Sequence, residues 1–133
     1  GGWAWHDGKG RFEHGGEVSA TNNRMELTAI LRAMQAQPTG ACVVIFSDSQ
    51  YCVNGLTIWK AGWKRKDWMK KGEPMPNRDL WLALDREQHR VNATFQWVRG
   101  HNGDAGNELA DRLAAAGRAG VVGMSRNAEK ENE

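Results

Sequence analysis

The sequence predicts an α/β domain in which helices flank a mixed sheet. An antiparallel hairpin stands first, and strands and helices alternate after about residue 20. The run ACVVIFSD is continuously apolar, which is typical of a strand buried on both faces. The 133 residues suit one domain with its own core. We predict a single domain over residues 1–124 and a polar, flexible tail over 125–133.

The first elements follow from alternation and periodicity. The segments GGWAWHD and RFEHGGEVS form the hairpin, with Gly8 and Gly10 in its connection. The segment NNRMELTAILRAMQAQ is an amphipathic helix that stops at Pro38 and Gly40. Its apolar stripe has the spacing i, i+3, i+4, i+7 and consists of Leu27, Ile30, Leu31 and Met34.

The remaining elements are shorter. After the buried strand we expect a short helix, SQYCVNGL, that ends near Gly55, and then a basic helical segment to about Lys66. KKGEPMPN reads as a loop, RDLWLALDREQHR as a helix, NATFQWVR as a strand and GHNG as a loop. DAGNELADRLAAAGRAG reads as the last helix.

Three carboxylates occupy positions that suit chemistry. Glu26 lies early in the first helix, Asp48 ends the buried strand, and Asp111 lies in the last helix. Ligands of open α/β sheets bind at the carboxyl ends of strands. If the three converge, they form an all-oxygen site that favours Mg²⁺ or Mn²⁺.

Each carboxylate also has a structural interpretation. Glu26 can complete a capping box with Asn23, which has the spacing N-x-x-E. Asp48 can cap the helix that follows it, and Asp111 can pair with a neighbouring arginine on a solvated face.

Positive charge and tryptophan coincide in one segment. Residues 60–71 contain six basic residues against a single acid, Asp67, and three of the seven tryptophans lie in or beside them: Trp59, Trp63 and Trp68. Trp59 and Trp63 are four residues apart and can form the buried stripe of a helix. The nearly uniform charge of the other face favours a surface that contacts a phosphate backbone.

Other residues bound the class of protein. His101 lies in a glycine-flanked loop, where a role in acid–base catalysis or water positioning suits it, whereas His6, His14 and His89 read as surface residues. Cys42 and Cys52 read as reduced, buried thiols of a cytoplasmic protein. No apolar run is long enough to span a membrane, and the first residues lack the apolar region of a signal peptide.

In this order, several segments resemble blocks of the type 1 ribonuclease H family, between Gly1 and about Ala119. They are TNNRMEL, SDSQYCVNGLTIW, GWKRKDW, NRDLW, WVRGHNG and NELADRLA. The resemblance implies an RNase H-like fold and endonucleolytic cleavage of the RNA strand of RNA–DNA hybrids, with little sequence specificity. It also implies a two-metal mechanism with Mg²⁺, or Mn²⁺ in its place. A monomer is the default expectation.

The resemblance also implies roles for single residues. Glu26, Asp48 and Asp111 are the metal-binding carboxylates, and His101 assists the attacking water or the departure of product. The residues that contact the hybrid are Thr21, Asn22, Asn23 and Gln50, with the basic protrusion of Trp59, Trp63, Lys64, Arg65, Lys66 and Trp68.

The chain departs from the family pattern at its start. The family opens with a central strand that carries an Asp-Gly-Ser motif and a fourth carboxylate, and this chain begins at GGWAW. We expect that nothing in the C-terminal segment GVVGMSRNAEKENE can replace it. We therefore expect an N-terminally incomplete domain in which the hairpin lacks its sheet partner, with little or no activity alone. The alternative is a non-catalytic module that binds RNA–DNA hybrids.

Overall fold

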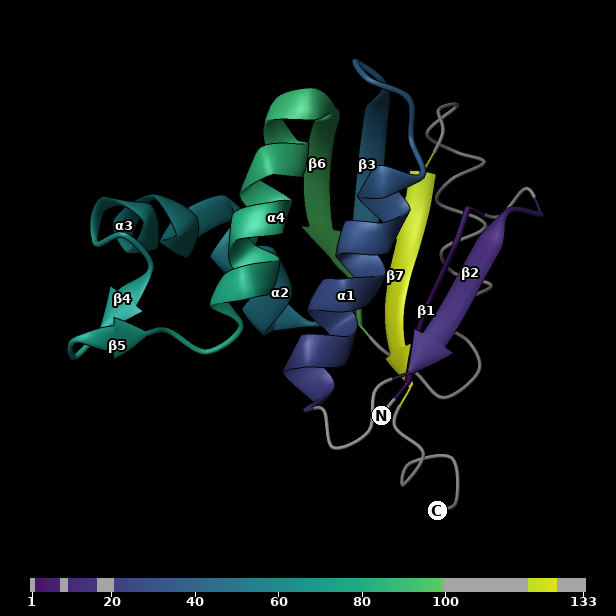
Figure 1. The fold of residues 1–133 in the computed structure, drawn as a ribbon. Helices are drawn as coiled ribbons and strands as arrows, with labels where there is room; N and C mark the ends of the chain where they lie inside the picture. The colour runs from purple at the N-terminus through teal and green to yellow at the C-terminus, as the bar shows by residue number, and fades with distance from the viewer. Residues whose placement is uncertain (1, 8–9, 17–20, 100–119, 127–133) are drawn as a thin grey trace.

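The computed structural model describes residues 2–7, 10–16, 21–99 and 120–126. Its main sheet has five strands in the order β2-β1-β7-β3-β6. The helices α1 (Asn22–Gln35) and α4 (Arg78–Arg90) lie side by side against one face of this sheet (Figure 1). Helix α3 (Lys60–Arg65) projects to one side, beyond α4. The predicted mixed sheet flanked by helices is confirmed.

The predicted hairpin is confirmed. Strands β1 (Gly2–His6) and β2 (Phe12–Gly16) pair antiparallel from Gly2 opposite Gly16 to His6 opposite Phe12. Strand β3 (Cys42–Ser47) is the predicted buried strand, and it pairs in parallel with β6 (Asn92–Trp97).

The expectation that the hairpin lacks a sheet partner is wrong. Strand β7 (Gly120–Arg126) lies between β1 and β3, antiparallel to β1 and parallel to β3. Its backbone therefore supplies the ladder hydrogen bonds that we expected to be missing. Its first five residues, GVVGM, combine glycine with apolar residues and bear no charge, which suits the interior of a sheet. It includes Ser125 and Arg126, so the predicted tail begins later than residue 125.

The helix stripes form the core. Leu27, Ile30, Leu31 and Met34 of α1 are all buried, as the periodicity predicted. They meet Ile45 of β3 and the α4 residues Trp81 and Leu84, which are fully buried. Arg90 then ties the ends of the two helices together, because its guanidinium donates to the carbonyl oxygens of Met34 and Gln37 at 2.8 Å.

The segment after β3 differs from the prediction of two separate helices. Helix α2 (Gln50–Asn54), the π-helical turn η1 (Gly55–Trp59) and α3 follow one another without a break. Gly55 does not end a helix, since its φ of −61° is helical. The predicted loop KKGEPMPN contains a small hairpin of β4 (Met69–Lys70) and β5 (Glu73–Pro74).

Gly55 is required by packing. A Cβ atom there would overlap Cη2 of Trp81 and lie 3.0 Å from Cζ2 of the same ring and 3.1 Å from Cζ3 of Trp63. Trp81 therefore packs directly on the backbone at the start of η1. The π-helical turn that follows changes the phase of the helix, which sets the direction in which α3 leaves the body of the domain.

Candidate nucleic-acid and metal site

Asp48 lies at the carboxyl end of β3, directly before α2. The residue that caps α2 is Ser49, whose Oγ accepts from the backbone N–H of Cys52 at 3.1 Å. The interpretation of Asp48 as this cap is therefore wrong. Two hydrogen bonds to main-chain carbonyl oxygens fix the surrounding turn. The Trp97 side chain donates from Nε1 to the carbonyl oxygen of Asp48 at 3.0 Å, and the backbone N–H of Val98 donates to that of Ser47 at 2.9 Å.

The start of α1 is also capped differently from the prediction. Thr21 is the N-cap, and its Oγ1 accepts from the N–H of Arg24 at 3.1 Å. The capping box between Asn23 and Glu26 is therefore wrong, since Asn22 and Asn23 both lie inside the first turn of the helix. Both asparagines are exposed, so their amides face solvent where a ligand can reach them.

Glu26 and Asp48 both act electrostatically on one buried thiol. Burial raises the pKa of Cys52 to about 12; the hydrogen bond with Ser49 opposes this, and the charges of Glu26 and Asp48 add to it. Glu26 is a half-buried residue of α1, and Asp48 is a half-buried residue at the end of β3. Their convergence into one metal site stays a prediction.

The rest of the predicted metal site is not described. Asp111 and His101 lie outside the described residues. Within the part of the chain that the structure covers, no three His, Cys, Asp or Glu side chains are grouped closely enough to hold a metal ion. The strand beside β3 adds no acid, because β7 reads GVVGMSR. Glu26 and Asp48 are hard oxygen donors, which is the ligand type that Mg²⁺ and Mn²⁺ prefer.

Gln50 belongs to the same end of the domain. It is the first residue of α2, two positions after Asp48, and it is exposed. Asn22 and Asn23 precede Glu26 in the first turn of α1, and Gln50 follows Asp48 in the first turn of α2. The three amides are exposed, neutral hydrogen-bonding groups at the first turns of α1 and α2.

The three tryptophans of the predicted protrusion differ in exposure. Trp59 is 41% exposed, whereas Trp68 is only 3% exposed and is part of the core. Trp63 is partly buried and packs edge-on against Trp81, with ring centroids 4.9 Å apart, and against Trp59 at 5.8 Å. The placement of Trp68 on the binding surface is therefore wrong, and the buried-stripe interpretation holds for Trp63.

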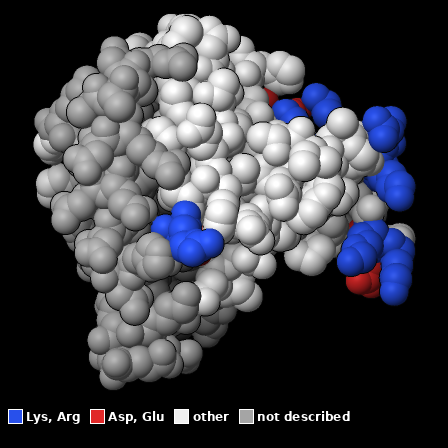
Figure 2. Space-filling model, turned by 180° about the vertical axis from the view of Figure 1, so that it is seen from behind, with Lys and Arg blue, Asp and Glu red and all other residues white. Residues whose placement is uncertain are grey.

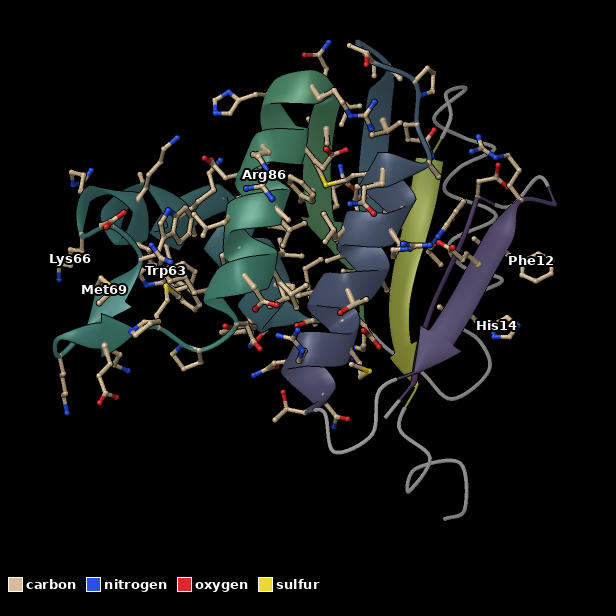
Figure 3. The ribbon with its side chains drawn as sticks, viewed as in Figure 1. Phe12, His14, Trp63, Lys66, Met69 and Arg86 are labelled. Atoms are coloured by element: carbon tan, nitrogen blue, oxygen red, sulfur yellow. The ribbon has the colours of Figure 1, made fainter. Side chains whose placement is uncertain are left out.

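The basic residues gather at the far end of the protrusion. Lys64, Arg65 and Lys66 are exposed at the end of α3. Figure 2 shows Lys and Arg side chains concentrated along this edge of the molecule. In Figure 3 Lys66 points outward from the tip, while Trp63 points back toward α4.

Sequence reasoning missed Asp85 of α4. Its Oδ1 lies 2.9 Å from Nζ of Lys60, and its Oδ2 lies 2.9 Å from Nζ of Lys64. Burial alone would raise the pKa of this carboxyl, but the hydrogen bonds from the two lysines outweigh it and lower the pKa. The available signal was a lone acid on an apolar helix face, four residues after Trp81 and one after Leu84.

Smaller differences concern the cysteines and histidines. Cys52 is buried as predicted, but Cys42 is exposed. His6 is partly buried, and burial lowers its pKa although Asp7 opposes the shift. His14 and His89 are exposed, as predicted.

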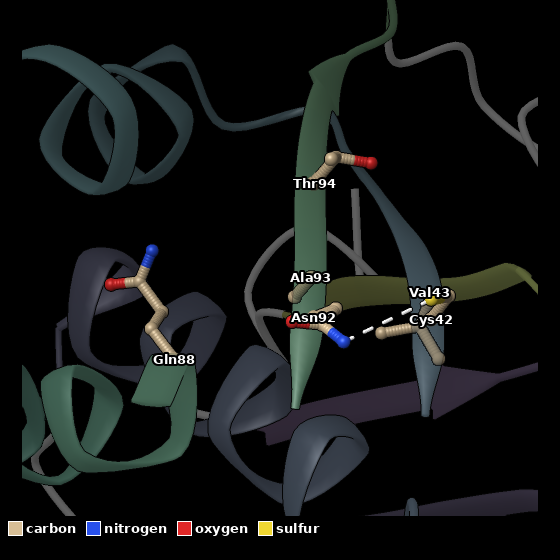
Figure 4. Close-up of a pocket in the computed structure, with 6 residues that line it drawn as sticks. All are labelled: Cys42, Val43, Gln88, Asn92, Ala93 and Thr94. Carbon is tan, nitrogen blue, oxygen red and sulfur yellow. Dashed lines mark hydrogen bonds between the residues drawn. The ribbon is translucent and has the colours of Figure 1, made fainter. Parts of the chain in front are cut away.

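A cavity of about 330 Å³ lies away from the carboxylates. It is lined by Cys42, Val43, Gln88, Asn92, Ala93 and Thr94 (Figure 4). These residues stand at the amino ends of β3 and β6 and near the C-terminus of α4, whereas Asp48 follows the carboxyl end of β3. The cavity is therefore separate from the candidate site.

Among the helices that the structure describes, none has the length and apolar content needed to cross a bilayer.

Comparison with known proteins agrees with this arrangement. Residues 1–119 match the family model for RNase H. The chain is 46% identical to a ribonuclease H of Anaeromyxobacter dehalogenans (strain 2CP-C), over 90% of this chain and 66% of that protein. It is 45% identical to a ribonuclease H of Bordetella avium (strain 197N), over 85% of this chain and 72% of that protein.

A solved structure is similar as well. The crystal structure of LC9-RNase H1, described as a type 1 RNase H with the type 2 active-site motif, is 33% identical, with a TM-score of 0.59. The match covers 90% of this chain and 59% of that one. The sequence matches and the similar fold agree, and the chain belongs to the RNase H family.

Proposed function

We propose that this chain acts in endonucleolytic hydrolysis of the RNA strand of RNA–DNA hybrids, with little sequence specificity, as a cytoplasmic monomer. The observation that supports the proposal is the position of Asp48 at the carboxyl end of the buried strand β3, where open α/β sheets bind ligands. Its charge and that of Glu26 in α1 both act on Cys52, and the amides of Asn22 and Asn23 at the start of α1 are exposed. A pair of acids next to neutral hydrogen-bonding groups suits phosphodiester chemistry on a substrate that is recognised by its shape and its 2′-hydroxyls.

The donor set fits a hard divalent metal. Glu26 and Asp48, with Asp111 from the sequence, would hold Mg²⁺, or Mn²⁺ in its place. Two such ions, when bound, supply a nucleophilic water, neutralise the phosphate and stabilise the leaving oxygen. The chain's own contribution would be to position these carboxylates around the ions. Ser49 caps α2 in place of Asp48, and Thr21 caps α1, so neither acid is needed as a cap.

The neutral side chains suit recognition of the hybrid. Asn22, Asn23 and Gln50 can each donate to and accept from 2′-hydroxyls and base edges of a minor groove. Thr21 can offer its hydroxyl proton there, since its Oγ1 only accepts from the helix. By the family resemblance, His101 assists the attacking water or the departure of product.

The protrusion suits the DNA strand of the hybrid. The exposed cations at the end of α3 match the repeated charge of a phosphate backbone. Trp59, at 41% exposure, offers an aromatic face beside them, and the more deeply packed Trp63 supports it.

A non-catalytic hybrid-binding module is the second candidate. It is favoured by one observation: β7, which lies between β1 and β3, carries no carboxylate, because Gly120–Arg126 contains no Asp or Glu. Such a module would keep the amides and the protrusion but would not need Glu26 and Asp48 as metal ligands.

The test is cleavage of a hybrid whose RNA strand is end-labelled, with Mg²⁺ and with EDTA. The chain alone is expected to cleave little, so the variants are made in a second protein, with an Asp-Gly-Ser strand of the family added before Gly1. There Asp48→Asn should abolish cleavage and retain binding, whereas the matched control Asp67→Asn, whose side chain is 87% exposed, should retain both. Cleavage that persists in Asp48→Asn or in EDTA would contradict the proposal. Comparison of the chain with the second protein separates the candidates. Binding without cleavage by both proteins favours the module.

A further inference from the structure

Asp85 holds two of the cations that belong to the basic segment. Its side chain is 13% exposed, and each of its oxygens accepts from a different lysine at 2.9 Å. The Lys60 ammonium also donates to Oε1 of Gln88 at 2.7 Å. His89 approaches Asp85 Oδ2 at 3.9 Å. The carboxylate is thus enclosed by positive or donating groups from two helices.

The two lysines differ from the cations that follow them. Lys60 is 21% exposed, and Lys64 is 50% exposed with its ammonium turned onto Asp85. Arg65 and Lys66 are exposed and form no ion pair with any residue that the structure describes. The segment therefore contains cations that are already neutralised and cations that are available to a polyanion.

Recruiting Lys64 to a phosphate has a cost that Arg65 and Lys66 do not share. Moving its ammonium away leaves Oδ2 of a mostly buried carboxylate without its closest donor. A phosphate contact made in exchange for the Asp85 contact still releases a counterion from the nucleic acid, but the carboxylate of Asp85 then takes up a cation in its place, so the net release is smaller. Proximity to the tip of the protrusion is therefore not sufficient to make a lysine a phosphate ligand.

We propose that Asp85 is a positioning residue that withholds Lys64 from the nucleic acid, so that Arg65 and Lys66 make the phosphate contacts of α3. The proposal rests on the proposed function, since it assigns the residues of the same binding surface. It revises the expectation from sequence that Lys64 contacts the hybrid together with Arg65 and Lys66.

The test is the slope of log K against log salt for binding of the chain to an RNA–DNA hybrid, without Mg²⁺. Arg65→Ala and Lys66→Ala should each flatten the slope by about 0.9 unit, the value for one lost phosphate contact. Lys64→Ala should leave the slope nearly unchanged in the natural chain. Equal flattening by Lys64→Ala and Arg65→Ala would overturn the proposal.

A double-mutant cycle examines the role of Asp85 itself. Asp85→Asn keeps the shape of the side chain and removes its charge. In that background Lys64→Ala should flatten the slope by about 0.9 unit, while the effect of Arg65→Ala should stay the same. A residue with a merely structural role would not make the effect of Lys64 depend on Asp85. If Asp85→Asn does not fold, the comparison of Lys64→Ala with Arg65→Ala in the natural chain still tests whether Lys64 contacts a phosphate.

A readout without nucleic acid separates this inference from the proposed function. NMR signals of the lysine ammonium groups should show two that are protected from exchange, and Asp85→Asn should remove the protection. Free, rapidly exchanging ammonium groups in the natural chain would overturn the inference. Absence of hybrid binding at low salt, with the two signals present, would instead count against the proposed function.

Discussion

Gly55→Ala offers a sharp test of how the protrusion is attached to the domain. Gly55 has a helical φ of −61°, so alanine is compatible with its backbone and intrinsically favoured there by about 1 kcal/mol. The added methyl group, however, would overlap the Trp81 ring and lie 3.1 Å from Trp63 Cζ3. Trp81 is 0% exposed and its Nε1 donates to the hydroxyl of Tyr51 at 3.3 Å, so the ring has little room to retreat.

Overpacking of this kind costs about 1–3 kcal/mol. After the gain in helix propensity is subtracted, Gly55→Ala should lower the free energy of unfolding by up to about 2 kcal/mol. The matched control is Gly62→Ala in α3, where the nearest atom to the new methyl group is Nη2 of Arg65 at 3.7 Å. That variant should raise the stability by about 0.5–1 kcal/mol.

The assay is urea denaturation of the natural chain and both variants at neutral pH, followed by circular dichroism. The two glycine substitutions should change the midpoint in opposite directions at similar m-values. If Gly55→Ala were as stable as Gly62→Ala, the close packing of Trp81 on the η1 backbone would be refuted. The same variant should weaken hybrid binding, because a displaced Trp81 moves the Trp63 ring that packs on it.

Three further predictions concern exposure and capping. Trp68→Ala should lower the unfolding free energy by about 3–5 kcal/mol, whereas Trp59→Ala should leave it within about 0.5 kcal/mol and weaken hybrid binding; the reverse order would contradict the burial of the two rings. Thr21→Ala should destabilise the chain by about 1 kcal/mol through loss of the α1 cap, and Asn23→Ala should reduce hybrid affinity with little change in urea midpoint. Ellman's reagent should titrate one thiol in the folded chain and both in urea, because Cys52 is fully buried; rapid reaction of two thiols in the native state would count against that core.

Much of the fold could be predicted because its signals are local. The apolar stripe of α1, the stripe around Trp81 in α4 and the run that forms β3 are each visible within a few turns or one strand. The small hairpin of β4 and β5 has two residues per strand, and Asp67, Trp68 and Lys71 enter or connect it with positive φ. Non-glycine residues in that conformation have no reliable local signature, so the segment read as a loop.

A residue of the candidate site could be predicted from the sequence only where its position along a strand or helix was enough to indicate its role. Asp48 follows a buried strand, and that alone indicated a ligand-binding edge. Thr21 and Asn23 are two positions apart and both are good caps, so the sequence alone does not decide which of them begins α1. The place of β7 between β1 and β3 is a long-range pairing, and its own sequence gives no indication of which strands it joins.

Helix α4 holds the segment that carries the proposed basic protrusion. Trp81 and Asp85 are one helical turn apart, and they face the long helical segment of residues 50–65 at two points. Trp81 packs on Gly55, at the start of η1, and Asp85 binds the lysines on either side of the first turn of α3. Two contacts fix both the distance and the rotation of a helix, where one would leave it free to pivot. The orientation of Arg65 and Lys66 toward a phosphate backbone therefore depends on an acid and a tryptophan in the body of the domain.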